Sequence, residues 1–244
     1  MVAYLEHLAA ESGRLRAAAA GALDEQVPTC PGWTGADLLL HVAEVYLHKA
    51  RTMAAGEWPQ PWPPDFTGAD PVETFDAAYA ELIGQLEPRP FADSTLTWYP
   101  ADQTVGFWAR RMAQEAVIHR IDAESAAGLP SAEIPVELAL DGVDEVLTCF
   151  LSFASTAFPQ AFSGALDGLD GRVVRVEAGP SSWYVTLSPT ITVSAGGTSD
   201  AVVRGEPGDV LRWLWRRADD SVVAIDGDAE LVHTLYGLLK TATQ

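Results

Sequence analysis

Three side chains, those of His41, Glu115 and His119, could together bind a divalent metal ion. Glu115 and His119 are four residues apart, so on a helix their side chains project from the same face. Two imidazoles and one carboxylate match the ligands of catalytic zinc sites, in which three protein ligands leave a fourth position open. The same set could hold iron or nickel. The residue types predict a metal centre, provided that the fold brings His41 to the other two.

Each of these residues also has a simpler interpretation. A glutamate and a histidine at this spacing often form a surface ion pair, and a core histidine such as His41 can bond to a backbone carbonyl. Metal binding is favoured because Trp108, Met112 and Ala123 lie on about the same helix face as the Glu–His pair. A charge buried among apolar groups without a partner is costly, and a metal ion would remove that cost.

Neighbouring residues offer one rival site and one supporting group. Glu44 and His48 share a helix face with His41, so they form a rival two-ligand site within one helix. Asp122 follows His119 by three residues and could orient its imidazole from behind the metal.

Other candidates have weaker support. Cys30 precedes Pro31 and has no basic neighbour in sequence that would lower its thiol pKa, so we interpret it as structural. Arg120 fits a salt bridge as well as it fits an active site. Four tryptophans could line a pocket, although aromatic residues more often belong to a core: Trp33, Trp58, Trp62 and Trp108.

Helices must position these residues, because apolar residues recur at helical spacing through the first half of the chain. Thr34 is the expected N-cap of the second helix, with Asp37 in capping-box position, and Pro71 takes the first position of the third. Long loops are expected over 56–70 and 88–103. The predicted helices cover about 5–23, 34–55, 70–86 and 104–127.

The second half changes from helical to alternating periodicity. One more helix is predicted over 136–154, and strands begin at about residue 171. The predicted strands are RVVRVEA, SWYVTLS, TITVS, DAVVRG and SVVAID, with helices over 206–217 and 228–242. We therefore expect an α+β fold with two domains, a four-helix bundle over 1–130 and a small α+β domain over 131–244.

The charge and cysteine content of the chain limit the kinds of partner and the location that we expect. The 244 residues include 15 Lys and Arg against 34 Asp and Glu, a net charge of −19, so nucleic acids and anionic membranes are unexpected partners. Two cysteines cannot build a disulfide framework. The N-terminal segment does not resemble a signal peptide, and no stretch is apolar enough to span a membrane. We expect a cytoplasmic monomer.

Two segments, CPGWTGADLLLH and EAVIHRIDAE, resemble the signature segments of the mycothiol-dependent maleylpyruvate isomerase-like family. The ending, VLRWLWRR followed by VVAIDGD, is also similar to that family, and the resemblance covers nearly the whole chain. It implies that the helical half is a DinB-like four-helix bundle and that the second half is a sterol-carrier-like α+β domain.

The resemblance also implies a function. It assigns His41, Glu115 and His119 to a divalent metal, with zinc as the first choice, and Arg217 to the anionic substrate. Arg216 stands where the family commonly has glycine, so it is the alternative arginine. The implied activity is a metal- and mycothiol-dependent isomerase that acts on a small unsaturated carboxylate. A mycothiol S-transferase and a non-catalytic, metal-containing small-molecule binding protein are the alternatives.

Overall fold

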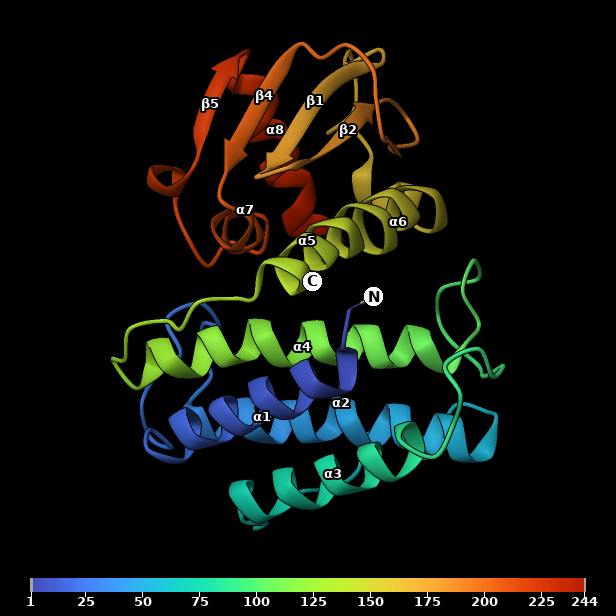
Figure 1. The fold of residues 1–244 in the computed structure, drawn as a ribbon, viewed down its shortest axis with the longest axis vertical. Coiled ribbons are helices and arrows are strands. Elements are labelled where there is room, and N and C mark those ends of the chain that lie inside the picture. The colour runs from blue at the N-terminus through green and yellow to red at the C-terminus, as the bar shows by residue number, and fades with distance from the viewer. Residues whose placement is uncertain (1, 244) are drawn as a thin grey trace. The chain divides into compact units, whose positions relative to one another are not determined.

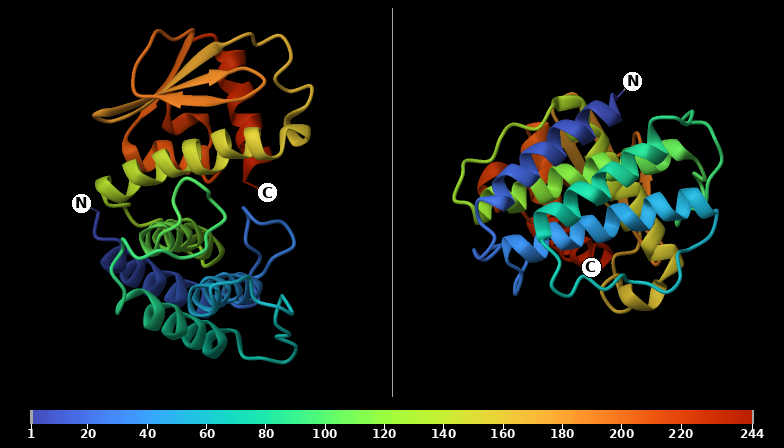
Figure 2. Two further views of the ribbon diagram at one scale, coloured as in Figure 1. Left: turned by 90° about the vertical axis from the view of Figure 1, so that its right-hand side faces the viewer. Right: turned by 90° about the horizontal axis from the view of Figure 1, so that it is seen from below.

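The structure is a computed structural model that describes residues 2–243. It divides into two compact units, Met1–Ala132 and Glu133–Gln244. The first unit is helical, and the second combines one sheet with helices (Figure 1, Figure 2). The predicted α+β class, with a helical first half and a strand-containing second half, is therefore confirmed. Among the described residues, no helix has both the length and the apolar character needed to cross a bilayer.

Four long helices form the first unit. They are α1 (Tyr4–Ala20), α2 (Gly35–Ala55), α3 (Pro71–Leu86) and α4 (Val105–Ala126). Helix α1 packs along α4 and α2 packs along α3, while α2 also contacts α4. The two helices that carry the candidate metal ligands, α2 and α4, are thus direct neighbours. Their buried apolar side chains include Leu38, Val42, Trp108, Met112 and Ala116.

The predicted helix starts are confirmed. The Asp37 backbone N–H donates to Thr34 Oγ1 at 3.2 Å, and the Thr34 N–H donates to the Asp37 carboxylate at 2.8 Å. This capping box begins α2 and thereby places His41 in its second turn. Helix α3 begins at Pro71, and the preceding Asp70 side chain accepts hydrogen bonds from two backbone N–H groups.

The helix predicted over 136–154 is interrupted. The structure has α5 (Val136–Glu145), a π-helical segment η1 (Val146–Ser152) and α6 (Phe153–Ala157). The Thr148 hydroxyl donates to the Asp144 carbonyl at 2.7 Å, so this carbonyl has a partner where the helical register changes. Hydrophobic spacing does not reveal a π-turn, because the apolar face continues through it.

The second unit contains one five-stranded sheet in the order β3-β2-β1-β4-β5. Strands β1 and β4 are parallel, and the other neighbouring pairs are antiparallel. From Val174 onward every second residue of β1 is buried, as the alternating pattern predicts. The strands are β1 (Arg172–Ala178), β2 (Ser181–Leu187), β3 (Thr192–Ser194), β4 (Ala201–Gly205) and β5 (Ala224–Gly227).

The fifth strand is shorter than predicted. Residues Asp220–Val222 form a 3-10 turn instead of the start of SVVAID. The turn is stabilised because the Ser221 N–H donates to the Asp219 carboxylate at 2.9 Å. Helices α7 (Pro207–Leu214) and α8 (Ala229–Ala242) both contact β1 and β4, and α5 packs against α7.

Helix α7 ends earlier than the predicted limit at Arg217. Arg216 has a left-handed backbone with φ of 60°. Its N–H donates to the Trp213 carbonyl at 2.9 Å, and the Arg217 N–H donates to the Arg212 carbonyl at 2.8 Å. These two bonds form a Schellman motif, in which glycine usually takes the left-handed position. The motif gives a physical reason for the glycine that is common there in the resembling family.

Arg120 is a structural cation. Its side chain is fully buried, and its guanidinium donates to Glu11 and to Glu124, each at 2.7 Å. It also donates to the Ala132 carbonyl at 2.9 Å. Arg120 therefore links α1, α4 and the end of the first unit, which supports the salt-bridge interpretation.

Replacing Arg120 with Met is expected to lower the free energy of unfolding by about 3–5 kcal/mol, because two buried carboxylates lose their cation. Arg14→Met is the matched control. Arg14 pairs with the same Glu11 at 3.5 Å but is 52% exposed, so its loss should cost less than about 1 kcal/mol. Urea denaturation of both variants measures the difference, and similar losses would contradict the assignment.

Candidate metal centre

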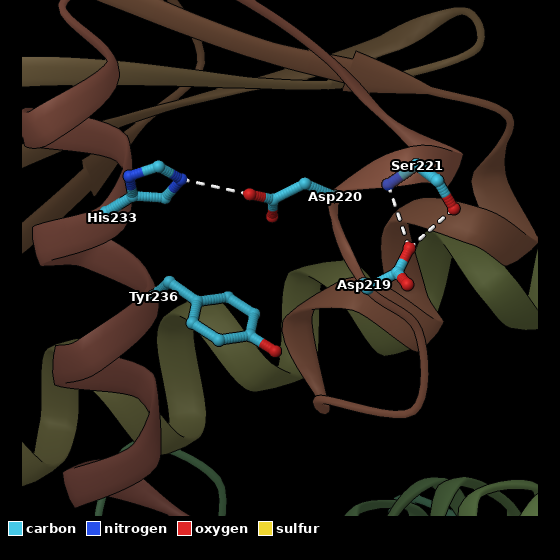
Figure 3. Close-up of a pocket in the computed structure, with 5 residues that line it drawn as sticks. All are labelled: Asp219, Asp220, Ser221, His233 and Tyr236. Carbon is cyan, nitrogen blue, oxygen red and sulfur yellow. Dashed lines mark hydrogen bonds and ion pairs between the residues drawn. The ribbon is translucent and has the colours of Figure 1, made fainter.

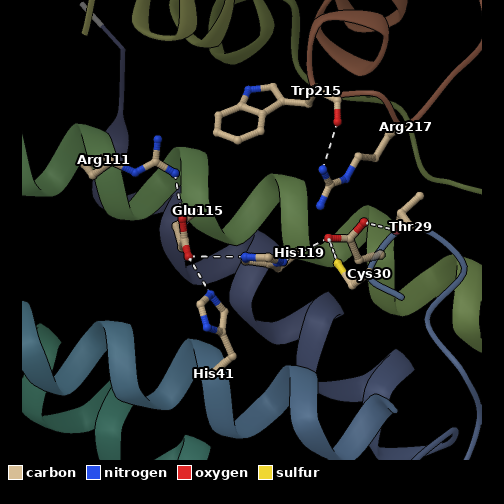
Figure 4. A network of polar contacts seen from close by, with 9 residues as sticks. Thr29, Cys30, His41, Arg111, Glu115, His119, Trp215 and Arg217 are labelled. Atoms are coloured by element: carbon tan, nitrogen blue, oxygen red, sulfur yellow. Dashed lines mark hydrogen bonds and ion pairs between the residues drawn. The ribbon is translucent and has the colours of Figure 1, made fainter. Parts of the chain in front are cut away.

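The structure brings together the three side chains that the sequence analysis singled out for metal binding. His41 comes from α2, and Glu115 and His119 come from α4. Glu115 Oε1 lies 3.6 Å from His41 Nε2 and 3.3 Å from His119 Nε2 (Figure 4). One potential ligand atom from each residue lies within 4.8 Å of the other two. Two imidazole nitrogens and one carboxylate oxygen thus face one small volume.

The rival pair on α2 is occupied by other contacts. Glu44 accepts a hydrogen bond from the Trp62 indole N–H at 3.2 Å. The His48 ring lies against Trp58 and Trp62, with centroids 5.5 and 4.9 Å away. Within residues 2–243, the only group of three or more His, Cys, Asp or Glu residues that meets metal-ligand spacing is the one centred on Glu115.

Arg111 is a further partner that the sequence analysis missed. It lies four residues before Glu115, and its Nη2 is 2.8 Å from Glu115 Oε2. Burial raises the pKa of Glu115, but the combined effect of His119, His41 and Arg111 holds it well below its ordinary value. The carboxylate is therefore ionised and can act as a ligand. The spacing that drew attention to His119 also applies to Arg111 on the preceding turn.

Asp122 orients His119 as expected. Its Oδ2 lies 2.9 Å from His119 Nδ1, which leaves Nε2 directed at Glu115. Burial lowers the pKa of His119, but Glu115 and Asp122 outweigh it and raise the pKa to about 9. When Nδ1–H donates to a carboxylate, Nε2 is the nitrogen that can bind a metal once its own proton has left.

The loop that contains CPGW holds Asp122 from the other side. The Thr29 hydroxyl donates to Asp122 Oδ1 at 2.5 Å, and the Cys30 thiol lies 3.7 Å from Oδ2 (Figure 4). Cys30 therefore contacts the group behind His119. This position agrees with a structural interpretation of the cysteine.

Trp33, in the same loop, packs against two of the candidate ligands. Its ring centroid lies 4.6 Å from that of His41 and 6.5 Å from that of His119. Two residues later, α2 begins at Gly35. A Cβ atom at this position would lie only 2.2 Å from the Ala22 carbonyl oxygen. Glycine is required there because α2 starts in close contact with the chain that leaves α1.

The other tryptophans have different surroundings. Trp108 is buried, and its indole N–H donates to the Leu96 carbonyl at 2.9 Å. Trp58 and Trp62 line a cavity of about 570 Å³ between the proline-rich loop and the end of α2. The alternative of pocket-lining tryptophans thus applies to these two, whereas Trp108 belongs to the core.

The two candidate arginines of the second unit are held differently. Arg217 Nη1 donates to the Trp215 carbonyl at 2.8 Å (Figure 4). Arg216 Nη2 donates to the Thr243 hydroxyl at the end of α8, at 2.9 Å. Burial, reinforced by the neighbouring charge of Arg217, lowers the pKa of Arg216.

A separate cavity of about 450 Å³ in the second unit is lined by polar residues (Figure 3). His233 Nε2 lies 3.0 Å from Asp220 Oδ2, and both side chains are half exposed. Ser221 bonds to Asp219 at 2.5 Å rather than to His233. The hydroxyl and the imidazole therefore do not form a nucleophile–base pair.

The geometry predicts that His119→Ala loses most of the bound metal. The purified protein should contain about one divalent ion per chain, as a three-ligand site requires. His233→Ala is the control, because His233 is an exposed histidine of the second unit. Elemental analysis of the two variants decides the point. If His119→Ala retained the metal of the unmodified protein, the ligand assignment would be wrong.

Zinc affinity should rise with pH. A pKa of about 9 keeps metal-free His119 protonated at neutral pH, so zinc must displace that proton. The affinity should increase about tenfold per unit between about pH 7 and pH 9. Calorimetry in two buffers of different ionisation enthalpy counts the released proton. Above the pKa of His119 the affinity should level off. Asp122→Asn removes one charge that raises this pKa, so the affinity should level off at a lower pH in this variant. An affinity that is flat over this range would contradict the protonation state described for His119.

Comparisons with known proteins cover both units. Residues 5–124 match the family model of the mycothiol maleylpyruvate isomerase N-terminal domain. Residues 137–234 match the family model of the MDMPI C-terminal domain. A search of curated proteins finds no match.

Two solved structures share the fold. One is the crystal structure of the mycothiol-dependent maleylpyruvate isomerase, whose sequence is 16% identical to this chain. The two structures match with a TM-score of 0.64 over 93% of this chain and 95% of that chain. A histidine-to-alanine variant of that isomerase is 15% identical, with the same TM-score and coverage. Because the two family matches follow one another along nearly the whole sequence, the chain belongs to the mycothiol-dependent maleylpyruvate isomerase-like family.

Proposed function

We propose that the protein is a metal-dependent isomerase of the maleylpyruvate isomerase type, which uses mycothiol and acts on a small unsaturated carboxylate. The observation that carries this proposal is the convergence of His41, Glu115 and His119. Membership of the family supports the choice of thiol and reaction. Three protein ligands leave a coordination position for a small molecule, which a purely structural site would not need.

The residues present fit a divalent ion. The set contains one ionised carboxylate and two imidazoles, each of which can bind a metal through an unprotonated nitrogen. These ligands suit zinc and also iron or nickel. His41 is 34% exposed, whereas Glu115 and His119 are 15% and 11% exposed. A small molecule can therefore reach the site on the His41 side, while the other two ligands remain sheltered.

Residues around the ligands hold them in place for this role. Arg111 fixes one oxygen of Glu115, and Asp122 fixes Nδ1 of His119. Such partners orient metal ligands and tune their basicity. A divalent ion at this site would favour the thiolate form of a bound thiol, the nucleophile that cis–trans isomerisation of a conjugated double bond needs.

We assign the substrate carboxylate to Arg217 rather than to Arg216. The Arg216 guanidinium already donates to Thr243, and its backbone closes the end of α7. The Arg217 guanidinium is positioned beside the end of α7, where its Nη1 donates to the Trp215 carbonyl. A positioned guanidinium can bind a carboxylate in bidentate fashion.

We also propose that the protein is a cytoplasmic monomer. Its partners would be the small-molecule thiol and the carboxylate substrate. Neither Cys30 nor Cys149 forms a disulfide, as is usual in a reducing compartment.

The test of the reaction is turnover of maleylpyruvate with mycothiol at a small fraction of the substrate concentration. An isomerase releases its thiol after each cycle, so many turnovers per thiol are expected. A product that retains one thiol per molecule would instead identify an S-transferase. Absence of any reaction by the zinc-loaded protein would leave metal-dependent binding without catalysis and overturn the proposed activity.

Arg217→Ala is expected to lower turnover of the carboxylate substrate at least about tenfold, the loss typical of one charged hydrogen bond. Metal content should not change. Arg216→Ala is the matched control and should retain turnover. If only Arg216→Ala lost turnover, Arg216 would be the residue that binds the carboxylate. If both variants kept full turnover, neither arginine of the second unit would bind the substrate.

A further inference from the structure

Lys49 is an unusual residue in this chain. The sequence contains only two lysines, Lys49 and Lys240. Lys240 is exposed in the last turn of α8. Lys49 lies in the second half of α2 and is partly buried, eight residues after His41. Partly burying an ammonium group is unfavourable unless other groups compensate for the lost water.

The contacts of Lys49 supply only part of that compensation. Its Nζ lies 5.2 Å from the centroid of the Trp108 ring and 3.2 Å from His48 Nδ1. The indole N–H of Trp108 is held by the Leu96 carbonyl, so the ring presents a fixed face to the ammonium. Among the described residues, no carboxylate lies within ion-pair distance of Lys49. The buried cation Arg111, by contrast, is paired with Glu115.

Charges on α2 and α4 face this ammonium. Burial lowers the pKa of Lys49 to about 8; Glu115 and Glu44 oppose that effect, whereas Arg111 adds to it. The two acidic residues do not restore the ordinary value. A further negative charge beside Nζ would therefore be stabilised, because it would favour the ammonium form.

The helix geometry places this ammonium within reach of the metal centre. Eight residues of helix correspond to about 12 Å, and the seven residues from Trp108 to Glu115 to about 10 Å. Lysine side chains on helices project toward the N-terminus, which for Lys49 is the direction of His41. The Glu115 carboxylate is close enough to act on the charge of Lys49, so one small molecule can contact both the ammonium and the metal ligands.

We propose that Lys49 binds a carboxylate of the small molecule that reaches the His41–Glu115–His119 centre. The inference rests on the proposed function and specifies its substrate class. Lys49 belongs to the same unit as the metal ligands, so one carboxylate is recognised by the first unit itself.

The presence of only two lysines permits a direct test. The full-length protein is labelled with lysine that carries ¹³C at Cε, and the two signals are assigned with Lys240→Met. Maleate, a small cis-dicarboxylate, is the probe, at constant ionic strength. Maleate is expected to raise the titration midpoint of Lys49 by at least about half a pH unit, because an adjacent anion stabilises the ammonium. The midpoint of Lys240 should not change.

Binding measurements on variants complete the test. Lys49→Met should weaken maleate binding at least about tenfold, and Lys49→Arg, which retains the charge, should preserve most of it. Lys240→Met is the matched control and should bind maleate normally. The proposal is overturned if maleate leaves the Lys49 midpoint unchanged, or if Lys49→Met binds as tightly as Lys240→Met. Because the titration uses the unmodified side chain, it decides the question even if Lys49→Met does not fold.

Zinc-loaded and chelator-treated protein are compared in parallel, so that the two proposals can fail separately. Normal zinc binding and turnover without a maleate effect on Lys49 would overturn only the role of this lysine. A maleate effect on Lys49 in a protein that binds no zinc would support the carboxylate subsite and contradict the metal-dependent function.

Discussion

The first unit depends on one constraint, which is that the Glu115 carboxylate is largely removed from water and must be neutralised. One of its oxygens faces Arg111, and the other faces His41 and His119. Losing any of these partners would leave the sheltered charge less fully compensated. The requirement extends outward, because His119 is held by Asp122 and Asp122 by the loop around Cys30. Helices α2 and α4 and this loop must therefore keep their positions for the charges to balance.

Local signals predicted most of the fold. The capping box at Thr34, the proline start of α3 and the alternating strands each depend on neighbours in sequence, and each is present. The interrupted helix at Val146–Ser152 and the early end of α7 were not predicted. Both depend on backbone geometry that residue types do not reveal, since Arg216 occupies a position where glycine would have signalled the helix end.

The candidate site was partly accessible from sequence. The four-residue spacing of Glu115 and His119 placed them on one helix face, and the same rule indicates Arg111, which was overlooked. The distance between His41 and this pair depends on how α2 and α4 pack, so residue types could include His41 only on the condition that the fold brings the two helices together, and the family resemblance supported that condition. The surroundings of Lys49 could not be predicted, because Trp108 comes from a different helix.

The central claim is that two imidazoles and one carboxylate hold a divalent ion that retains a position for a thiol. X-ray absorption spectroscopy of the zinc-loaded protein, with and without mycothiol, tests it most directly. The account predicts nitrogen and oxygen ligands at about 2.0–2.2 Å, with one sulfur added at about 2.3 Å when the thiol is present. A spectrum without imidazole scattering, or one that gains no sulfur, would contradict the account.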